Sequence, residues 1–183
     1  MTRAAADIQQ DPTPPHPEVF LQRARAMHDR LLERAPQARS LRRLPDETIA
    51  DFKQAGFFRM MQPRRYGGYE MSPRHFYDVV FEISRACPSS GWVLSVVGVH
   101  NWQMALLDDR AQQEVWGEDQ DVIISSSYAP KGKVKPAPGG YRFSGRWQFS
   151  SGSDHCRWIF VGGFIPGATD SPPTISSFLI PRQ

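Results

Sequence analysis

Cysteine is scarce in this chain of 183 residues. Cys87 and Cys156 stand far apart, and neither belongs to a Cys-x-x-Cys or Cys/His pattern. A disulfide framework needs several paired cysteines, and a structural zinc site needs closely spaced ligands. The sequence therefore predicts neither a disulfide scaffold nor a metal site, and a reducing cytoplasm suits this cysteine content best.

Long apolar runs are also absent. No segment approaches the roughly 18 uninterrupted apolar residues of a membrane span, and no apolar stretch follows the first basic residue. We therefore expect no membrane insertion and no recognisable export leader. The net charge is only +3, and the arginines are interspersed with acids such as Asp29 and Glu33. This pattern is typical of a solvated helix surface rather than a nucleic-acid interface.

The first hundred or so residues show helical periodicity. Residues 1–17 are polar and rich in proline, which predicts a disordered arm. Apolar residues then recur on one face from Glu18, and we expect this helix to stop at Pro36. Asp46 is the expected cap of a second helix that ends at Gly56.

Two further helix starts follow. Ser72-Pro73 is a cap followed by a first-turn proline, and the helix should continue to Ala86. Residues 89–107 form an apolar run that suits either a buried strand or a buried helix, and its length favours the helix. Asp108 or Asp109 should cap a short helix that reaches Trp116.

After Asp119 the pattern changes to strands. We expect strands over 121–128, over 141–150, from about Trp158, and over 174–180, with loops over 131–140 and 166–173. The predicted organisation is a disordered arm over 1–17, a helical domain over 18–119 and a β domain over 120–183.

The segment from Tyr141 to Gly152 carries large aromatic side chains and ends in paired serines. An aromatic face beside short hydroxyls suits a planar heterocycle such as an isoalloxazine ring. On the local pattern alone, an ordinary hairpin with aromatic cross-strand pairs and a serine turn is the more common explanation.

Several motifs in the same order resemble one known family. They are Leu41 to Thr48, Gly67-Gly68, Gly91-Trp92, Gly98 to Trp102, Glu114 to Gly117, Ile124 to Pro130 and Phe149 to His155. The chain resembles the oxygenase components of two-component flavin-dependent aromatic hydroxylases, closest to the seco-steroid phenol 4-hydroxylases and more distantly to the 4-hydroxyphenylacetate hydroxylases. The resemblance implies an α+β fold of the acyl-CoA dehydrogenase type. In that fold a helical N-terminal domain is followed by a β-barrel-like middle domain and a C-terminal four-helix bundle, which this chain lacks.

The resemblance also implies the reaction. Reduced FMN or FAD arrives from a separate NAD(P)H-dependent reductase and reacts with O2 to form a flavin hydroperoxide, which hydroxylates a small aromatic or steroid phenol ortho to its hydroxyl. The protein has to orient the phenol and exclude water. The family implies a cytoplasmic homotetramer at full length, and we expect the isolated 183-residue chain to be inactive.

Family motifs assign roles to individual residues. The positions that match flavin contacts are Trp92, Ser126, Ser127, Tyr128, Phe149, Ser150 and Ser151. The matching catalytic positions are His100, close to the phenol, and Ser151, close to the flavin N5. Steroid-type relatives usually carry tryptophan where this chain has Phe149. Without the resemblance, a histidine in an apolar helix is more often a core residue.

Two other functions fit the same architecture. An acyl-CoA dehydrogenase-like flavin oxidoreductase usually carries a Thr-Glu-Pro type strand end, where this chain has Ser126-Ser127-Tyr128-Ala129-Pro130. A truncated, non-catalytic fragment of either enzyme is the second alternative. Asp154 and His155, which follow the serines, are expected to hold their loop in place.

Overall fold

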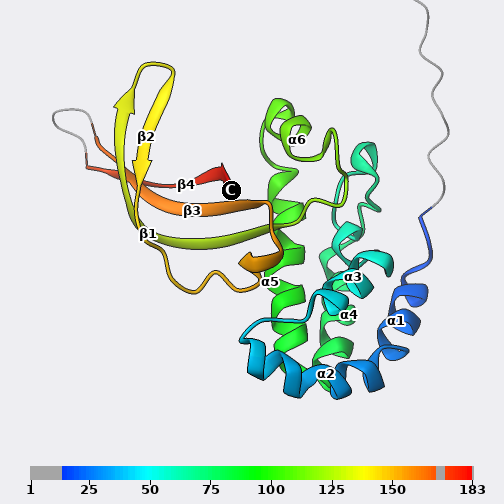
Figure 1. Cartoon of the computed structure of the whole chain (residues 1–183). Coiled ribbons are helices and arrows are strands. Elements are labelled where there is room, and N and C mark those ends of the chain that lie inside the picture. The colour runs from blue at the N-terminus through cyan, green and yellow to red at the C-terminus, as the bar shows by residue number, and fades with distance from the viewer. Residues whose placement is uncertain (1–13, 168–171, 183) are drawn as a thin grey trace, which may run out of the picture.

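Helices precede strands along the chain, as predicted. A computed structural model of the protein describes residues 14–167 and 172–182. The helices are α1 Pro17–Arg25, α2 His28–Leu41, α3 Asp46–Gln54, α4 Pro73–Ala86, α5 Pro88–Met104 and α6 Asp109–Trp116 (Figure 1). The strands are β1 Ile124–Ala137, β2 Gly140–Ser144, β3 Trp158–Ile165 and β4 Thr174–Pro181. The predicted arm lies mostly outside the described residues, and α1 begins at its last position, Pro17.

The prediction of one helix from Glu18 to Pro36 is wrong in its bounds. The chain forms two helices that are interrupted at Ala26 and Met27, where buried Met27 and a contact between His28 and Glu82 of α4 hold it bent (Nε2–Oε1 3.1 Å). Pro36 lies inside α2 instead of ending it. The carbonyl that a residue-36 N–H would have bonded belongs to Leu32, which is 56% exposed, so water can satisfy it.

Helix caps were predicted with mixed success. Ser72 caps α4 by accepting a hydrogen bond from the Arg74 N–H (3.3 Å), and Asp108 caps α6 in the same way. Asp46 is not the cap of α3, because Pro45 occupies that position and the Asp46 carboxylate binds Arg43 instead (2.7 Å). Local capping rules hold where no neighbouring cation competes for the side chain.

The apolar run after Cys87 forms a helix, as its length indicated. The Phe76 ring of α4 packs directly on Gly98 of α5, where an added Cβ would lie 2.4 Å from the ring. Buried Leu94 and Val97 face the core of the helical part. Trp92 and Trp102 of the same helix are exposed, so α5 is apolar on its outer surface as well.

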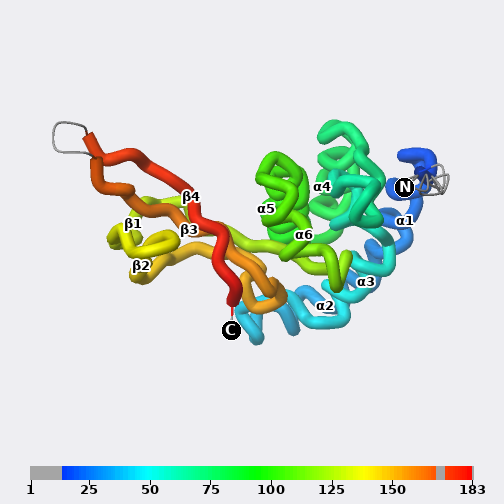
Figure 2. The backbone as a smooth tube through the Cα atoms, turned by 90° about the horizontal axis from the view of Figure 1, so that it is seen from above, coloured from blue at the N-terminus to red at the C-terminus, as the bar shows by residue number. Residues whose placement is uncertain are grey.

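The strands form one curled sheet in the order β2-β1-β3-β4 (Figure 1). β1 pairs in parallel with β3, whereas the β1–β2 and β3–β4 pairs are antiparallel. Figure 2 shows the outer part of this sheet extending away from the helices. The ends of β1 and β3 that lie nearer the helices run against α5.

The predicted loop over 131–140 is wrong for most of its length. β1 continues to Ala137 and forms a hairpin with β2, in which Val134 pairs with Phe143. Pro136 is tolerated because pairing with β3 ends at Lys133, so the proline faces only one neighbouring strand. Of the predicted 166–173 loop, residues 168–171 lie outside the described residues.

The predicted strand over 141–150 is too long. β2 ends at Ser144, because Trp147 folds back onto the sheet. Its ring stacks on Phe143 (centroids 5.1 Å apart), and its N–H donates a hydrogen bond to the Gly162 carbonyl (2.9 Å). Residues 145–150 therefore follow an irregular path towards α5.

Candidate functional site

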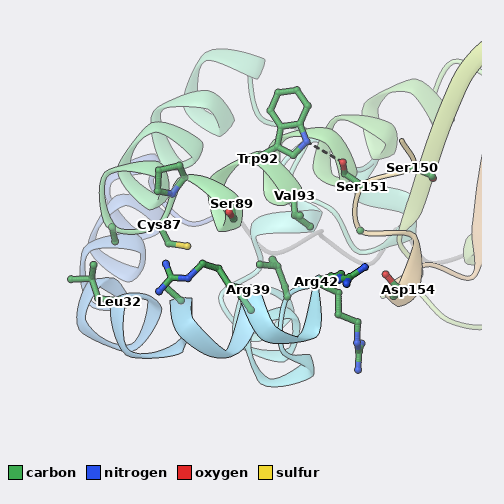
Figure 3. Close-up of a pocket in the computed structure, with 17 residues that line it drawn as sticks. Leu32, Arg39, Arg42, Cys87, Ser89, Trp92, Val93, Ser150, Ser151 and Asp154 are labelled. Atoms are coloured by element: carbon green, nitrogen blue, oxygen red, sulfur yellow. Dashed lines mark hydrogen bonds between the residues drawn. The ribbon is translucent and has the colours of Figure 1, made fainter. Parts of the chain in front are cut away.

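A cavity of about 940 Å³ lies between α2, the start of α5 and the loop after β2 (Figure 3). Its wall comprises Leu32, Ala35, Ala38, Arg39, Arg42, Arg43, Leu44, Ala86, Cys87, Pro88, Ser89, Trp92, Val93, Ser150, Ser151, Gly152 and Asp154. Apolar residues, short hydroxyls and arginines therefore meet around one hollow. Its volume lies within the range of small-molecule and cofactor sites, about 300–1,000 Å³.

Three of the predicted flavin contacts, Trp92, Ser150 and Ser151, meet at this wall. Trp92 projects from the first turns of α5 with 61% of its surface exposed, and its indole N–H donates a hydrogen bond to the Ser151 hydroxyl (3.1 Å; Figure 3). The neighbouring Ser150 hydroxyl is buried and has no hydrogen-bond partner among the described residues. An exposed indole face beside two hydroxyls can stack on a planar ring and bond its polar edge.

The backbone of the serine loop is fitted against α5. Gly152 has φ +75°, and a Cβ there would lie 2.8 Å from Val97 and 3.0 Å from Val93. The Cys156 thiol donates a hydrogen bond to the Gly152 carbonyl, and burial raises the pKa of this thiol to about 12. Cys156 is therefore a neutral part of the loop and not a nucleophile.

His100 lies in a second part of the site, two turns further along α5. Its side chain is buried at 3% exposure, and its ring meets Tyr128 and Phe160 edge to face, at centroid distances of 5.9 and 6.0 Å. Neither ring nitrogen has a hydrogen-bond partner among the described residues. Burial lowers the pKa of His100 to about 4, so the imidazole is neutral at pH 7.

The three predicted flavin contacts on β1, Ser126, Ser127 and Tyr128, do not share one environment. The Tyr128 hydroxyl bonds Gln103 of α5, and burial raises its pKa, so the phenol is protonated at pH 7. Ser126, two residues earlier in β1, lies on the same face of the strand as Tyr128. Ser127 faces elsewhere, because its hydroxyl donates to the Gln148 carbonyl (2.7 Å) and holds the irregular segment that follows β2.

Phe149 is not brought to the cavity. Its side chain is 93% exposed, its φ is +60°, and it does not line the wall described above. The structure thus groups Trp92 with Ser150 and Ser151, and His100 with Tyr128. His100 is also absent from the cavity wall, so this cavity does not bring Phe149 or His100 together with Ser151.

Residues of α2 and of the turn that follows it line the cavity, and they were not predicted from the sequence. Arg39 and Arg42 make no ion pair within the part of the chain that the structure describes, whereas Arg43 is paired with Asp46. The run from Arg39 to Arg43 was visible in the sequence. Because arginines on an amphipathic helix usually face solvent, only the tertiary structure distinguishes this group.

No cluster of three or more His, Cys, Asp or Glu side chains suited to a metal ion occurs within residues 14–167 and 172–182. Over the same residues, no helix has the length and apolar character required to cross a membrane.

The helical part of the fold is that of a known family. Residues 15–118 match the family described as acyl-CoA dehydrogenase, N-terminal domain, and the chain belongs to this family. It is 48% identical over 164 residues to the flavin-dependent monooxygenase oxygenase subunit HsaA of Rhodococcus jostii, covering 89% of this chain and 42% of the relative. The motif resemblance noted in the sequence is thereby confirmed.

A second relative and a solved structure show similarity to the same kind of protein. The p-hydroxyphenylacetate 3-hydroxylase oxygenase component of Acinetobacter baumannii is 36% identical over 164 residues, which cover 90% of this chain and 39% of the relative. The crystal structure of the HsaA monooxygenase from Mycobacterium tuberculosis matches 92% of this chain and 46% of its own, with a TM-score of 0.86 and 44% identity. The chain thus spans about two fifths of the length of its curated relatives.

Proposed function

We propose that this chain is the N-terminal part of an oxygenase component in a two-component flavin-dependent monooxygenase, which hydroxylates a phenol ortho to its hydroxyl. The observation that carries the proposal is the Trp92–Ser151 pair on the wall of a cavity of about 940 Å³. The motif resemblance to the seco-steroid phenol 4-hydroxylases favours a phenol of the steroid-degradation type as substrate, and the 48% identity over 164 residues to an HsaA oxygenase subunit supports the same reaction class.

The residues present fit a reduced flavin. Trp92 offers an exposed ring face, and the Ser151 hydroxyl accepts a hydrogen bond from its indole N–H. Ser150 also lines the cavity, and its buried hydroxyl has no hydrogen-bond partner among the described residues. When bound, reduced FMN or FAD reacts with O2 and supplies the oxygen atom that enters the phenol ring. We assign Ser151 to the ring edge, where its hydroxyl orients the reacting face and stabilises developing charge.

His100 is assigned to the phenol. A buried imidazole with two unpartnered nitrogens has hydrogen-bonding capacity that a ligand can satisfy. Because its pKa is lowered to about 4, the ring is neutral at pH 7 and accepts a hydrogen bond from the phenol hydroxyl. This bond draws electron density towards the ring carbons and fixes which carbon faces the oxidant.

The apolar surroundings of His100 have a protective role. Its neighbours Tyr128 and Phe160 present ring edges, and Tyr128 is held by Gln103. The His100 side chain is only 3% exposed, and this burial keeps water from the imidazole, which limits loss of the activated oxygen as hydrogen peroxide. We further propose a separate NAD(P)H-dependent flavin reductase as partner, a homotetramer as the assembly and the cytoplasm as the location.

Coupled turnover of the full-length protein tests the proposal. The assay combines a flavin reductase, NADH, FMN or FAD, and a panel of phenols that includes steroid-derived ones, with the catechol product identified by mass spectrometry. We expect one added oxygen atom per turnover. Oxidation of acyl-CoA thioesters without phenol hydroxylation would instead establish the acyl-CoA dehydrogenase-like alternative. Absence of both activities, together with no flavin binding, would indicate a non-catalytic protein.

A further inference from the structure

The His155 side chain connects the serine loop to the helical half of the molecule. It leaves the short helical turn Ser153–His155, and its Nδ1 lies 3.2 Å from an Asp46 carboxylate oxygen at the start of α3. Asp46 is in turn held by both terminal nitrogens of Arg43, at 2.7 and 3.0 Å. Arg43 lines the same cavity as Ser150 and Ser151.

This contact differs from an ordinary surface ion pair. The His155 side chain is only 5% exposed, although that of Asp46 is 70% exposed. Burial is the largest influence on the His155 pKa and lowers it, whereas Asp46 and Asp154 oppose the shift and Arg43 reinforces it. A neutral imidazole therefore donates its Nδ1–H to a carboxylate that Arg43 keeps ionised and oriented.

Backbone hydrogen bonds within the loop connect His155 to the residues on either side of Ser151. The His155 N–H donates to the Gly152 carbonyl and the Ser153 N–H to the Ser150 carbonyl, each over 3.1 Å. Gly152 is pressed against α5, and Ser151 is bonded to Trp92. A tight turn thus lies between two anchors, Trp92 on one side and Asp46 on the other.

We propose that His155 is a positioning residue, which holds Ser151 in place through its bond to the Arg43–Asp46 pair. The inference rests on the proposed function, because Ser151 is the group that meets the flavin edge. His155 itself does not line the cavity. Its effect on hydroxylation therefore passes through Ser151, and a displacement of the loop misplaces that hydroxyl.

A double-mutant cycle in the full-length protein tests this. The measured quantity is product formed per reduced flavin consumed, for His155→Leu and Asp46→Ala in the wild-type and Ser151→Ala backgrounds. Each single change should lower this ratio about fivefold or more, and neither should lower it further once Ser151 is alanine. His155→Asn, whose amide reproduces the Nδ1 donor, should restore most of the ratio.

Controls separate positioning from simple destabilisation. Glu47→Ala removes a neighbouring acid from the same first turn of α3 and should leave the ratio unchanged. If His155→Leu does not fold, Asp46→Ala decides the question, because that side chain is largely exposed. Equal losses from Glu47→Ala and Asp46→Ala, or undiminished losses in the Ser151→Ala background, would overturn the proposal.

One measurement does not depend on the reaction. Amide hydrogen exchange of residues 150–156 should accelerate in Asp46→Ala and remain unchanged in Glu47→Ala. If the wild-type protein hydroxylates no phenol but this difference is found, the proposed function fails while the anchoring of the loop stands. If exchange is the same in both variants, the anchoring fails irrespective of the reaction.

Discussion

Trp92 of helix α5 and Ser151 of the β part are 59 residues apart in the sequence and are joined by a hydrogen bond of 3.1 Å. The bond connects the first turns of α5 with the loop after β2. The indole keeps 61% of its surface exposed beside the cavity. One side chain thus both orients a hydroxyl and presents an aromatic face.

Trp92→Phe keeps an aromatic face and removes the N–H. A net hydrogen bond contributes about 1 kcal/mol, so we expect the dissociation constant of reduced flavin to rise about fivefold. Fluorescence titration under anaerobic conditions measures it. Trp102→Phe is the matched control, since this exposed tryptophan lies on the same helix but does not line the cavity. Equal weakening in both variants would contradict the role of the bond.

His100 should make stability depend on pH. Its pKa is about 4 in the folded protein against 6.5 for the free side chain, so between these values the unfolded chain binds more protons. The stabilisation is therefore fully present above pH 6.5 and is lost as the pH falls towards 4. Between pH 7 and pH 5 we expect the free energy of unfolding to fall about 2 kcal/mol more in the wild type than in His100→Phe.

Urea unfolding at the two pH values measures this difference. Contributions from other titrating groups, including His155, are common to both proteins and cancel. An equal loss of stability in wild type and variant would show that His100 is not held neutral by burial.

The sequence predicted local structure well and distant pairing poorly. Ser72-Pro73 and Asp108 were identified as helix starts because a cap bonds backbone groups only two or three residues away. The hairpin of β1 and β2 was not predicted. Its Phe143 packs on Phe178 of β4, with ring centroids 4.6 Å apart, although the two residues are far apart in the sequence. The periodicity of apolar residues within one segment does not reveal contacts of this kind.

The arrangement of the candidate site residues could also be predicted only in part. Family motifs, rather than residue spacing, pointed to Trp92, Ser151 and His100, and the structure places the first two together. Phe149 has a left-handed backbone and an exposed side chain, which no alternation of side chains indicates. Asp46 was interpreted as a helix cap, because its partner His155 lies in the other half of the chain.

Gly152→Ala should be costly for two separate reasons. The left-handed backbone alone costs an alanine about 1 kcal/mol, and the added Cβ would collide with Val97 at 2.8 Å, for a total of about 2–4 kcal/mol. Gly139→Ala is the matched control, because it has a similar φ of +78° and nothing within 4 Å of its Cβ position. It should cost only about 1 kcal/mol by chemical denaturation. Equal costs would mean that the loop does not press on α5.

Ser126 and Ser127 are adjacent, but they should have different roles. Ser127→Ala removes the bond to the Gln148 carbonyl and should lower the free energy of unfolding by about 1 kcal/mol. Ser126→Ala should change stability by less than about 0.5 kcal/mol, and it should weaken flavin binding several-fold because Ser126 is one of the positions that the family motif assigns to the flavin. Chemical denaturation and flavin titration of both variants measure the two effects. The opposite result, in which Ser126→Ala unfolds more readily and binds flavin normally, would reassign this strand end from binding to structure.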